Sequence, residues 1–235
     1  YGYYNGIDTV ALNIRNLVNQ VLLIEQLMES GGGWQDQIGG LFPGVKLITT
    51  NPEYPCCYHI NYLDTGIELL DDSSLVIDTR IQRKAARILY SIRQKYVDRD
   101  PAALHVLNYI AGNAPLGFRY LKEGNIHSFA EILSESWEMV NSIESGSVEI
   151  VERLKNFCGR DLLGAKIGGA GGGGFLLAIF ENREIREYYS KRIRDVFANC
   201  LVHEPRFGGS GMLLRQETAA GSQVLHIGFT PSLTG

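Results

Sequence analysis

The sequence is poor in cysteine and has no cysteine pattern typical of a metal site. Four cysteines occur among its 235 residues, and two of them, Cys56 and Cys57, are neighbours. No CxxC pair occurs, and no cysteine and histidine have the spacing of zinc ligands. We therefore expect reduced thiols and a cytoplasmic location, because disulfides are rare in reducing compartments.

Long hydrophobic runs and an excess of basic charge are also missing. The longest purely apolar run, Phe175 to Phe180, is far too short to cross a bilayer, and no N-terminal signal pattern is visible. The formal net charge is −4, whereas a general polyanion binder would be basic. We therefore expect no membrane span and no nucleic-acid partner.

Glycine is the residue that is present in excess. The chain has 27 glycines, whereas an average composition of about 7% glycine would give about 16. They gather in two places, around residues 31–40 and in the run 168–174. With 45% hydrophobic and 20% charged residues, the rest of the chain has the composition of a globular protein with an ordinary core.

The N-terminal third predicts one helix followed by a turn and two strands. Apolar residues recur at 3.6-residue spacing over residues 8–29, which predicts a helix. A glycine-bounded turn is expected at 31–40, a strand at 45–50 and a second strand at 58–61. The polar segment 69–74 reads as a turn, and we place a domain boundary near it.

The remainder alternates helices with short apolar strands, which predicts an α+β fold in two parts. Helices are expected at 81–96, 101–123 with a break near Pro115, 125–144, 148–157 and from Asn182 to about 198. Strands are expected at 75–77, on both sides of the glycine run within 164–180, at 200–204 and at 224–227.

The glycine run between two strands is the first candidate site. A plain hairpin needs one or two glycines, whereas six of the seven residues from Gly168 to Gly174 are glycine. Without side chains, successive N–H groups can approach an anion closely. The run satisfies GxGxxG, but the apolar strand 175–180 follows it where a dinucleotide-binding fold would have a helix.

A pair of carboxylates is the second candidate site. Glu25 projects from the apolar face of the first helix, where a carboxylate needs a cation, a metal or hydrogen-bond donors, or else forms a salt bridge. Asp36 lies in the glycine-flanked turn just beyond that helix. One acid to hold Mg²⁺ and a second to accept a proton is what phosphoryl transfer needs.

These segments resemble the GHMP kinase superfamily. Lys166 to Gly174 looks like the third motif of that superfamily, and the stretch from Leu23 to Lys46 is similar to L-fucose kinases, with Gly-Gly-Trp-Gln-Asp-Gln as its most specific part. Thr79 and Arg83 fit a weaker segment between them. The resemblance implies a GHMP-kinase-like α+β fold with an incomplete N-terminal domain in residues 1–72 and a ferredoxin-like C-terminal domain in residues 73–235.

The resemblance also implies a reaction and residue roles. The expected activity is ATP- and Mg²⁺-dependent phosphorylation of the anomeric hydroxyl of L-fucose. Asp36 would be the catalytic base and Glu25 the Mg²⁺ ligand. The nucleotide would contact Gly169, Ala170, Gly171, Gly172 and Gly173, and the sugar would contact Gly33, Trp34, Gln35 and Gln37. Trp34 is equally suited to core packing, because aromatic rings fill cores as readily as they stack on sugars.

The sequence departs from the superfamily pattern in three respects. The Gly-Leu-Gly-Ser-Ser type phosphate loop is absent, so we expect a C-terminal fragment that lacks the N-terminal part of its own polypeptide. Gly168 stands where Ser, Thr or Pro is frequent, and Arg80 stands where Gly usually follows Thr.

Three other interpretations remain open. The chain could belong to a heptose kinase or another sugar-1-kinase of the superfamily. It could be a non-catalytic remnant that binds a ligand or a partner. A dinucleotide-dependent enzyme is the third alternative, and it requires a helix directly after Gly174.

Overall fold

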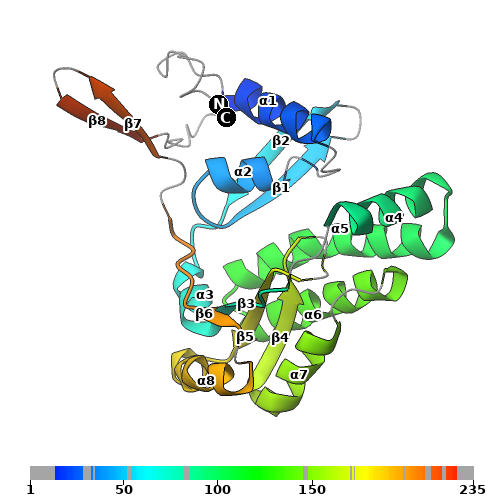
Figure 1. Cartoon of the computed structure of the whole chain (residues 1–235), viewed down its shortest axis with the longest axis vertical. Helices are drawn as coiled ribbons and strands as arrows, with labels where there is room; N and C mark the ends of the chain where they lie inside the picture. The colour runs from blue at the N-terminus through cyan, green and yellow to red at the C-terminus, as the bar shows by residue number, and fades with distance from the viewer. Residues whose placement is uncertain are drawn as a thin grey trace. The chain divides into compact units, whose positions relative to one another are not determined.

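A four-stranded antiparallel sheet forms the centre of the larger part of the chain. Its strands are β3 (Ser74–Asp78), β4 (Leu162–Ile167), β5 (Phe175–Phe180) and β6 (Leu201–His203), in the spatial order β4-β5-β3-β6 (Figure 1). Every neighbouring pair is antiparallel. Helices separate β3 from β4 and β5 from β6, so the chain order and strand order are those of a ferredoxin-like fold. The expected α+β architecture is therefore confirmed.

The computed structural model describes residues 14–28, 33, 35–51, 54–81, 85–144, 148–169, 171, 173–197, 199–209, 213–218 and 221–226. It divides into two compact units. The first consists of residues 1–44, 50–58 and 208–235, and the second of residues 45–49 and 59–207. The assignment of residues 1–72 and 73–235 to two GHMP kinase domains stays a prediction.

The first unit contains two helices and a C-terminal hairpin. The helices are α1 (Ile14–Leu27) and α2 (Gln35–Leu41), and they pack against each other. Strands β7 (Leu213–Thr218) and β8 (Gly221–His226) pair antiparallel. The sequence did not predict β7. Strands β1 (Lys46–Asn51) and β2 (Tyr54–Tyr62) form a further two-stranded sheet, as the two predicted strands required.

The second unit contains most of the helices. They are α3 (Ile67–Ser73), α4 (Ala85–Val97), α5 (Pro101–Lys122), α6 (Ile126–Ile143), α7 (Val148–Cys158) and α8 (Arg183–Val196), with a short 3₁₀ turn at Gly159–Asp161. Side-chain caps begin three of them: Asp100, Asn125 and Asn182 each accept a hydrogen bond from a backbone N–H three residues later. The caps that the sequence predicted at Asn125 and Asn182 are confirmed.

Three local predictions were wrong. The turn expected at 31–40 holds the helix α2, and the turn expected at 69–74 holds most of α3. The break expected near Pro115 does not occur, because α5 runs through it. Pro115 is exposed, so water can bond the carbonyl group that proline deprives of its amide partner.

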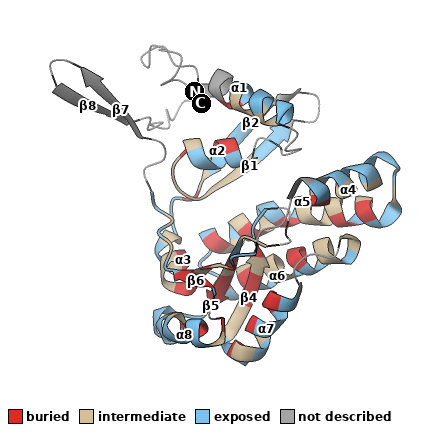
Figure 2. Cartoon of the chain, viewed as in Figure 1, coloured by how far each residue is buried: buried red, intermediate tan, exposed pale blue. Residues whose placement is uncertain are grey.

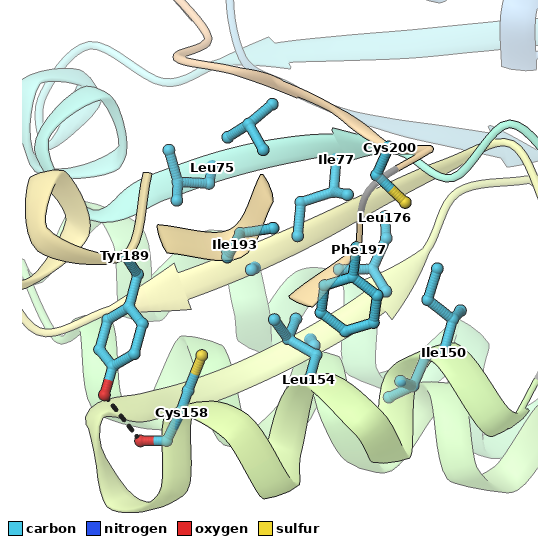
Figure 3. Close-up of a cluster of buried hydrophobic side chains, with 14 of the residues drawn as sticks. Leu75, Ile77, Ile150, Leu154, Cys158, Leu176, Tyr189, Ile193, Phe197 and Cys200 are labelled. Atoms are coloured by element: carbon cyan, nitrogen blue, oxygen red, sulfur yellow. Dashed lines mark hydrogen bonds between the residues drawn. The ribbon is translucent and has the colours of Figure 1, made fainter. Parts of the chain in front are cut away.

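The sheet buries both of its faces, and β5 shows this most clearly. Leu176, Ala178 and Phe180 belong to one hydrophobic cluster with α7 and α8, whereas Leu177 and Ile179 belong to a second cluster with α3, α5 and α6. This alternation follows from the two-residue period of a strand. Figure 2 shows the buried positions concentrated along these strands, and Figure 3 shows the first cluster.

Buried thiols border the first cluster. Cys158 and Cys200 are both buried and unbridged. Burial raises the pKa of Cys158 to about 12, with a smaller contribution from the charge of Asp161. Tyr189 Oη donates to Cys158 O at 3.1 Å and to Asp161 Oδ2 at 2.8 Å, and so closes this end of the core (Figure 3). The expectation of reduced thiols is confirmed for these two cysteines.

None of the helices in the described part of the chain is long and apolar enough to span a bilayer.

Candidate functional site

The loop between β4 and β5 owes its glycine content to its backbone conformation. Gly169, Gly171, Gly173 and Gly174 have φ values of 67°, 83°, 147° and 82°. Residues other than glycine rarely adopt these φ angles, because their Cβ then collides with the neighbouring peptide groups. The glycine run is therefore a requirement of the loop path and not merely of a tight hairpin.

Close neighbours impose glycine a second time at two of these positions. A Cβ on Gly171 would lie 3.0 Å from Cζ3 of Trp137, which α6 places beneath the loop. A Cβ on Gly173 would lie only 2.4 Å from the carbonyl oxygen of Ile81. The loop is thus packed directly against α6 and the segment that follows β3.

Hydrogen bonds fix both ends of the loop. Thr79 donates twice to the carbonyl oxygen of Gly174, from its backbone N at 2.9 Å and from Oγ1 at 2.8 Å. Gly174 N in turn donates to Ile81 O at 3.1 Å, and Gly168 N donates to Phe175 O at 2.8 Å. Thr79 is buried, so this link is shielded from water. The loop is consequently held in place before any ligand arrives.

Between these anchors the loop presents free amide groups. Within the described part of the loop, the N–H groups of Gly169, Gly171 and Gly173 donate to no acceptor among the described residues. Backbone N–H groups that have no acceptor within the protein can bind an anion. Ala170 and Gly172, which the sequence also assigned to the nucleotide, lie outside the described residues.

One cationic residue precedes the loop in the sequence, and another follows Thr79, which anchors the loop. Arg80 follows Thr79 and is exposed, with its Nε 3.1 Å from Asp78 Oδ2. Lys166 lies at the end of β4, two residues before Gly168, and its partial burial lowers its pKa. Such N–H groups with nearby cations can bind phosphate oxygens.

Most of the predicted sugar and base residues belong to α2, in the first unit. Asp36 lies in the first turn of this helix and is exposed, where the helix macrodipole favours a carboxylate. Gln35 and Gly33 are exposed as well. Trp34 lies outside the described residues.

Gln37 behaves differently from its neighbours. Its exposed fraction is 6%, and neither its side-chain oxygen nor its nitrogen has a hydrogen-bond partner in the structure. Burying an amide without partners costs about 1–3 kcal/mol. This side chain is therefore suited to bind a polar ligand that replaces the missing partners.

Glu25, the predicted metal ligand, lies on α1 and is half-buried. The full burial expected from the helix face is not observed. Among the described residues, no group of three His, Cys, Asp or Glu side chains is arranged to hold a metal ion. One carboxylate still fits Mg²⁺, which usually keeps several waters and takes its remaining ligands from substrate phosphates.

The structure thus groups the predicted residues by unit. Glu25, Asp36, Gln35 and Gln37 belong to the first unit, and the glycine loop belongs to the second. The carbonyl of Ile81, which excludes a side chain from Gly173, was not foreseen. No sequence signal marks it, because any residue carries the same carbonyl.

The four-stranded sheet and its glycine loop define a recognisable class. Residues 118–197 match the family described as GHMP kinases C terminal. The galactokinase of Lactococcus lactis, solved with galactose, shares the fold with a TM-score of 0.56 and 16% identity, over 83% of this chain and 56% of that one.

Two sequence relatives are more specific. The chain is 32% identical over 184 residues to the bifunctional fucokinase/GDP-fucose pyrophosphorylase of Arabidopsis thaliana. It is 29% identical over 186 residues to the L-fucokinase/L-fucose-1-P guanylyltransferase of Bacteroides fragilis. The matches cover 77% and 76% of this chain but only 17% and 19% of the relatives, so the chain spans under a fifth of their length.

The alternative of a dinucleotide-dependent enzyme is wrong. It required a helix after Gly174, and β5 begins at Phe175 instead. The glycine spacing that satisfies GxGxxG arises here from the path of a strand–loop–strand connection.

Proposed function

We propose that the protein containing this chain is an ATP-dependent sugar kinase that converts L-fucose to L-fucose 1-phosphate. The observation that carries the proposal is the glycine loop, which Thr79 and Ile81 anchor. The N–H groups of Gly169, Gly171 and Gly173 have no acceptor among the residues that the structure describes. The family match to GHMP kinases and the two fucokinase relatives support the sugar as the acceptor.

The glycine loop would hold the phosphate groups of ATP. Its N–H groups donate to phosphate oxygens without having to move, because both ends of the loop are already bonded to neighbouring backbone. Such preorganised donors lower the barrier of phosphoryl transfer, which depends mainly on positioning and charge stabilisation. Ala170 and Gly172 are proposed to contribute with Gly169, Gly171 and Gly173.

Asp36 would take the proton from the anomeric hydroxyl as its oxygen forms a bond to the γ-phosphorus and ADP leaves. Asp36 is exposed in the first turn of α2, so its carboxyl group is accessible to a substrate hydroxyl. Glu25 would hold Mg²⁺, which neutralises charge on the phosphates when it is bound. Gly33, Trp34, Gln35 and Gln37 would contact the sugar, and the unpartnered amide of Gln37 favours this role.

The first test is Asp36→Asn in the whole polypeptide that contains this chain, assayed with ATP, Mg²⁺ and a panel of free sugars. We expect the variant to lose at least a hundredfold in kcat, because general-base catalysis contributes about 10²–10⁴-fold. MgATP affinity should change little. Asp98→Asn, an exposed acid at the end of α4, is the matched control and should keep full turnover.

The outcomes separate the possibilities. Wild-type turnover with L-fucose supports the proposal, and turnover with a heptose instead assigns another sugar-1-kinase. A wild-type protein that transfers no phosphate to any sugar would point to a non-catalytic binding role. Unchanged turnover in Asp36→Asn would contradict the role of that carboxylate.

A further inference from the structure

Arg80 has a backbone conformation that its residue type disfavours. Its φ is 55°, in the left-handed region, which is strained for a residue with a Cβ. Residues held in such conformations are frequent at ligand sites, where the surrounding structure imposes them. Glycine would adopt this angle without strain, so the presence of arginine calls for a physical reason.

The neighbours of Arg80 hold it beside the glycine loop. Thr79, on one side, donates to Gly174 O, and Ile81, on the other, accepts from Gly174 N. Thr79 Oγ1 also accepts from Ile81 N at 3.3 Å, which closes the turn around Arg80. The residues on both sides of Arg80 are therefore hydrogen-bonded to Gly174, the last residue of the loop.

The side chain of Arg80 is only partly engaged. Its Nε lies 3.1 Å from Asp78 Oδ2, and its backbone N donates to Asp78 Oδ1 at 3.0 Å. The two terminal nitrogens, Nη1 and Nη2, have no acceptor among the described residues. The Arg80 side chain is 55% exposed, and an ion pair this exposed contributes little to stability. The pair with Asp78 therefore does not account for the strain.

The register of the sheet also places Asp78 of this ion pair beside the end of the loop. Asp78, at the end of β3, is the cross-strand partner of Phe175, the residue directly after Gly174. Asp78, the ion-pair partner of Arg80, thus lies beside the strand residue that directly follows the loop. A guanidinium with two unoccupied N–H pairs matches the spacing of phosphate oxygens.

We propose that Arg80 is a phosphate-binding residue of this loop, which exchanges its ion pair with Asp78 for the phosphate oxygens of a bound nucleotide. The inference deepens the proposed function and depends on it. The site thereby gains a cation at a position where relatives of the superfamily are expected to have glycine.

The test is calorimetric binding of MgATP and of adenosine to the whole polypeptide carrying Arg80→Gly. We expect the variant to bind MgATP about tenfold more weakly and adenosine equally well, since only the phosphate contact is lost. The salt dependence of MgATP binding should also decrease. Arg80→Lys keeps the charge but not the paired N–H groups. Its affinity for MgATP should lie between those of the wild type and Arg80→Gly.

Arg99→Gly provides the matched control. Arg99 is also an exposed arginine with a positive φ, 56°, but it lies in the turn between α4 and α5. Arg99→Gly makes the same backbone change in that turn, and the affinity for MgATP should not change. Asp78→Asn should bind MgATP as tightly as the wild type or more tightly, because it releases Arg80 and removes a negative charge.

Two results would overturn the inference. Equal MgATP affinity in Arg80→Gly and the wild type would show that Arg80 does not contact the phosphates, while the kinase proposal would stand. Equal weakening by Arg80→Gly and Asp78→Asn would show that the ion pair acts by shaping the turn. If the wild type binds no MgATP, the proposed function fails, and this inference fails with it.

Discussion

At the scale of single residues, the glycine loop combines two separate demands. At Gly169 only the backbone angle requires glycine, because a Cβ there would meet nothing within 4 Å. At Gly173 the angle and the carbonyl of Ile81 both require it. The two positions therefore allow conformational strain to be separated from steric exclusion.

We expect Gly173→Ala to be more damaging than Gly169→Ala. The Gly169 variant should lose about 1–2 kcal/mol of stability, the cost of a left-handed conformation with a Cβ. The Gly173 variant should lose more and should also weaken MgATP binding, because the loop must move away from Ile81. Urea unfolding and calorimetry on both variants would measure this. Equal losses would show that the Ile81 contact is unimportant.

At the scale of elements, a polar link joins α4 to the end of α6. Ser91 Oγ donates to Glu144 Oε2 at 2.6 Å, and Lys95 Nζ bonds both to Glu144 Oε2, at 3.3 Å, and to the carbonyl of Ile143. The Ser91 hydrogen bond, followed by Lys95, lowers the pKa of Glu144 despite some burial. The carboxylate is thus stabilised in its charged form.

This link should make stability depend on acid. A carboxyl group whose folded pKa is lowered contributes stability above its unfolded pKa, near 4.5, and loses it as pH falls through the folded value. Ser91→Ala should therefore reduce stability at pH 7 by about 1 kcal/mol and flatten the acid-dependent loss below pH 4.5. Thermal unfolding between pH 3 and pH 7 would show it.

Ser142→Ala is the control for this measurement. Ser142 Oγ donates to Met139 O within α6. It bonds to no carboxylate of the described residues. Its pH profile should run parallel to that of the wild type. A Ser91→Ala profile that also ran parallel would contradict the link to Glu144.

A close contact between elements explains one further glycine. A Cβ on Gly164 of β4 would lie 2.2 Å from the carbonyl oxygen of Ala130 on α6. Next to it, Ala165 N donates to Ser134 Oγ of the same helix at 3.0 Å. Helix α6 therefore rests directly on the strand that leads into the glycine loop, and it carries Trp137 beneath Gly171.

At the scale of the whole molecule, the loop depends on the buried sheet of the second unit. Leu154 of α7 is fully buried in the cluster that packs one face of β3, β4 and β5. Leu154→Ala should cost about 2–5 kcal/mol, the usual range for a buried leucine. Denaturant unfolding would measure it, and Glu152→Ala, exposed on the same helix, should cost far less. Similar losses in both variants would contradict the assignment of Leu154 to the core.

Much of the architecture was predictable because it depends on local patterns. Short apolar runs predicted β3, β4 and β5, and Asn125 and Asn182 marked the starts of α6 and α8. The sequence also indicated the α+β class and the strand–glycine loop–strand connection, whereas the role of that loop as a ligand site stays a prediction. These features are set by side-chain periodicity and by short-range hydrogen bonds, both of which a sequence displays directly.

Only the tertiary structure decided the rest. Helix α2 forms where glycines predicted a turn, because burial of the apolar Ile38 outweighs weak helix propensity. Which glycines are forced to be glycine depended on the positions of Trp137 and Ile81, both distant in sequence from the loop. The strained Arg80 was visible in the sequence only as an unusual residue. Its conformation and free terminal nitrogens follow from the bonds that tie Thr79 and Ile81 to Gly174, which no local pattern records.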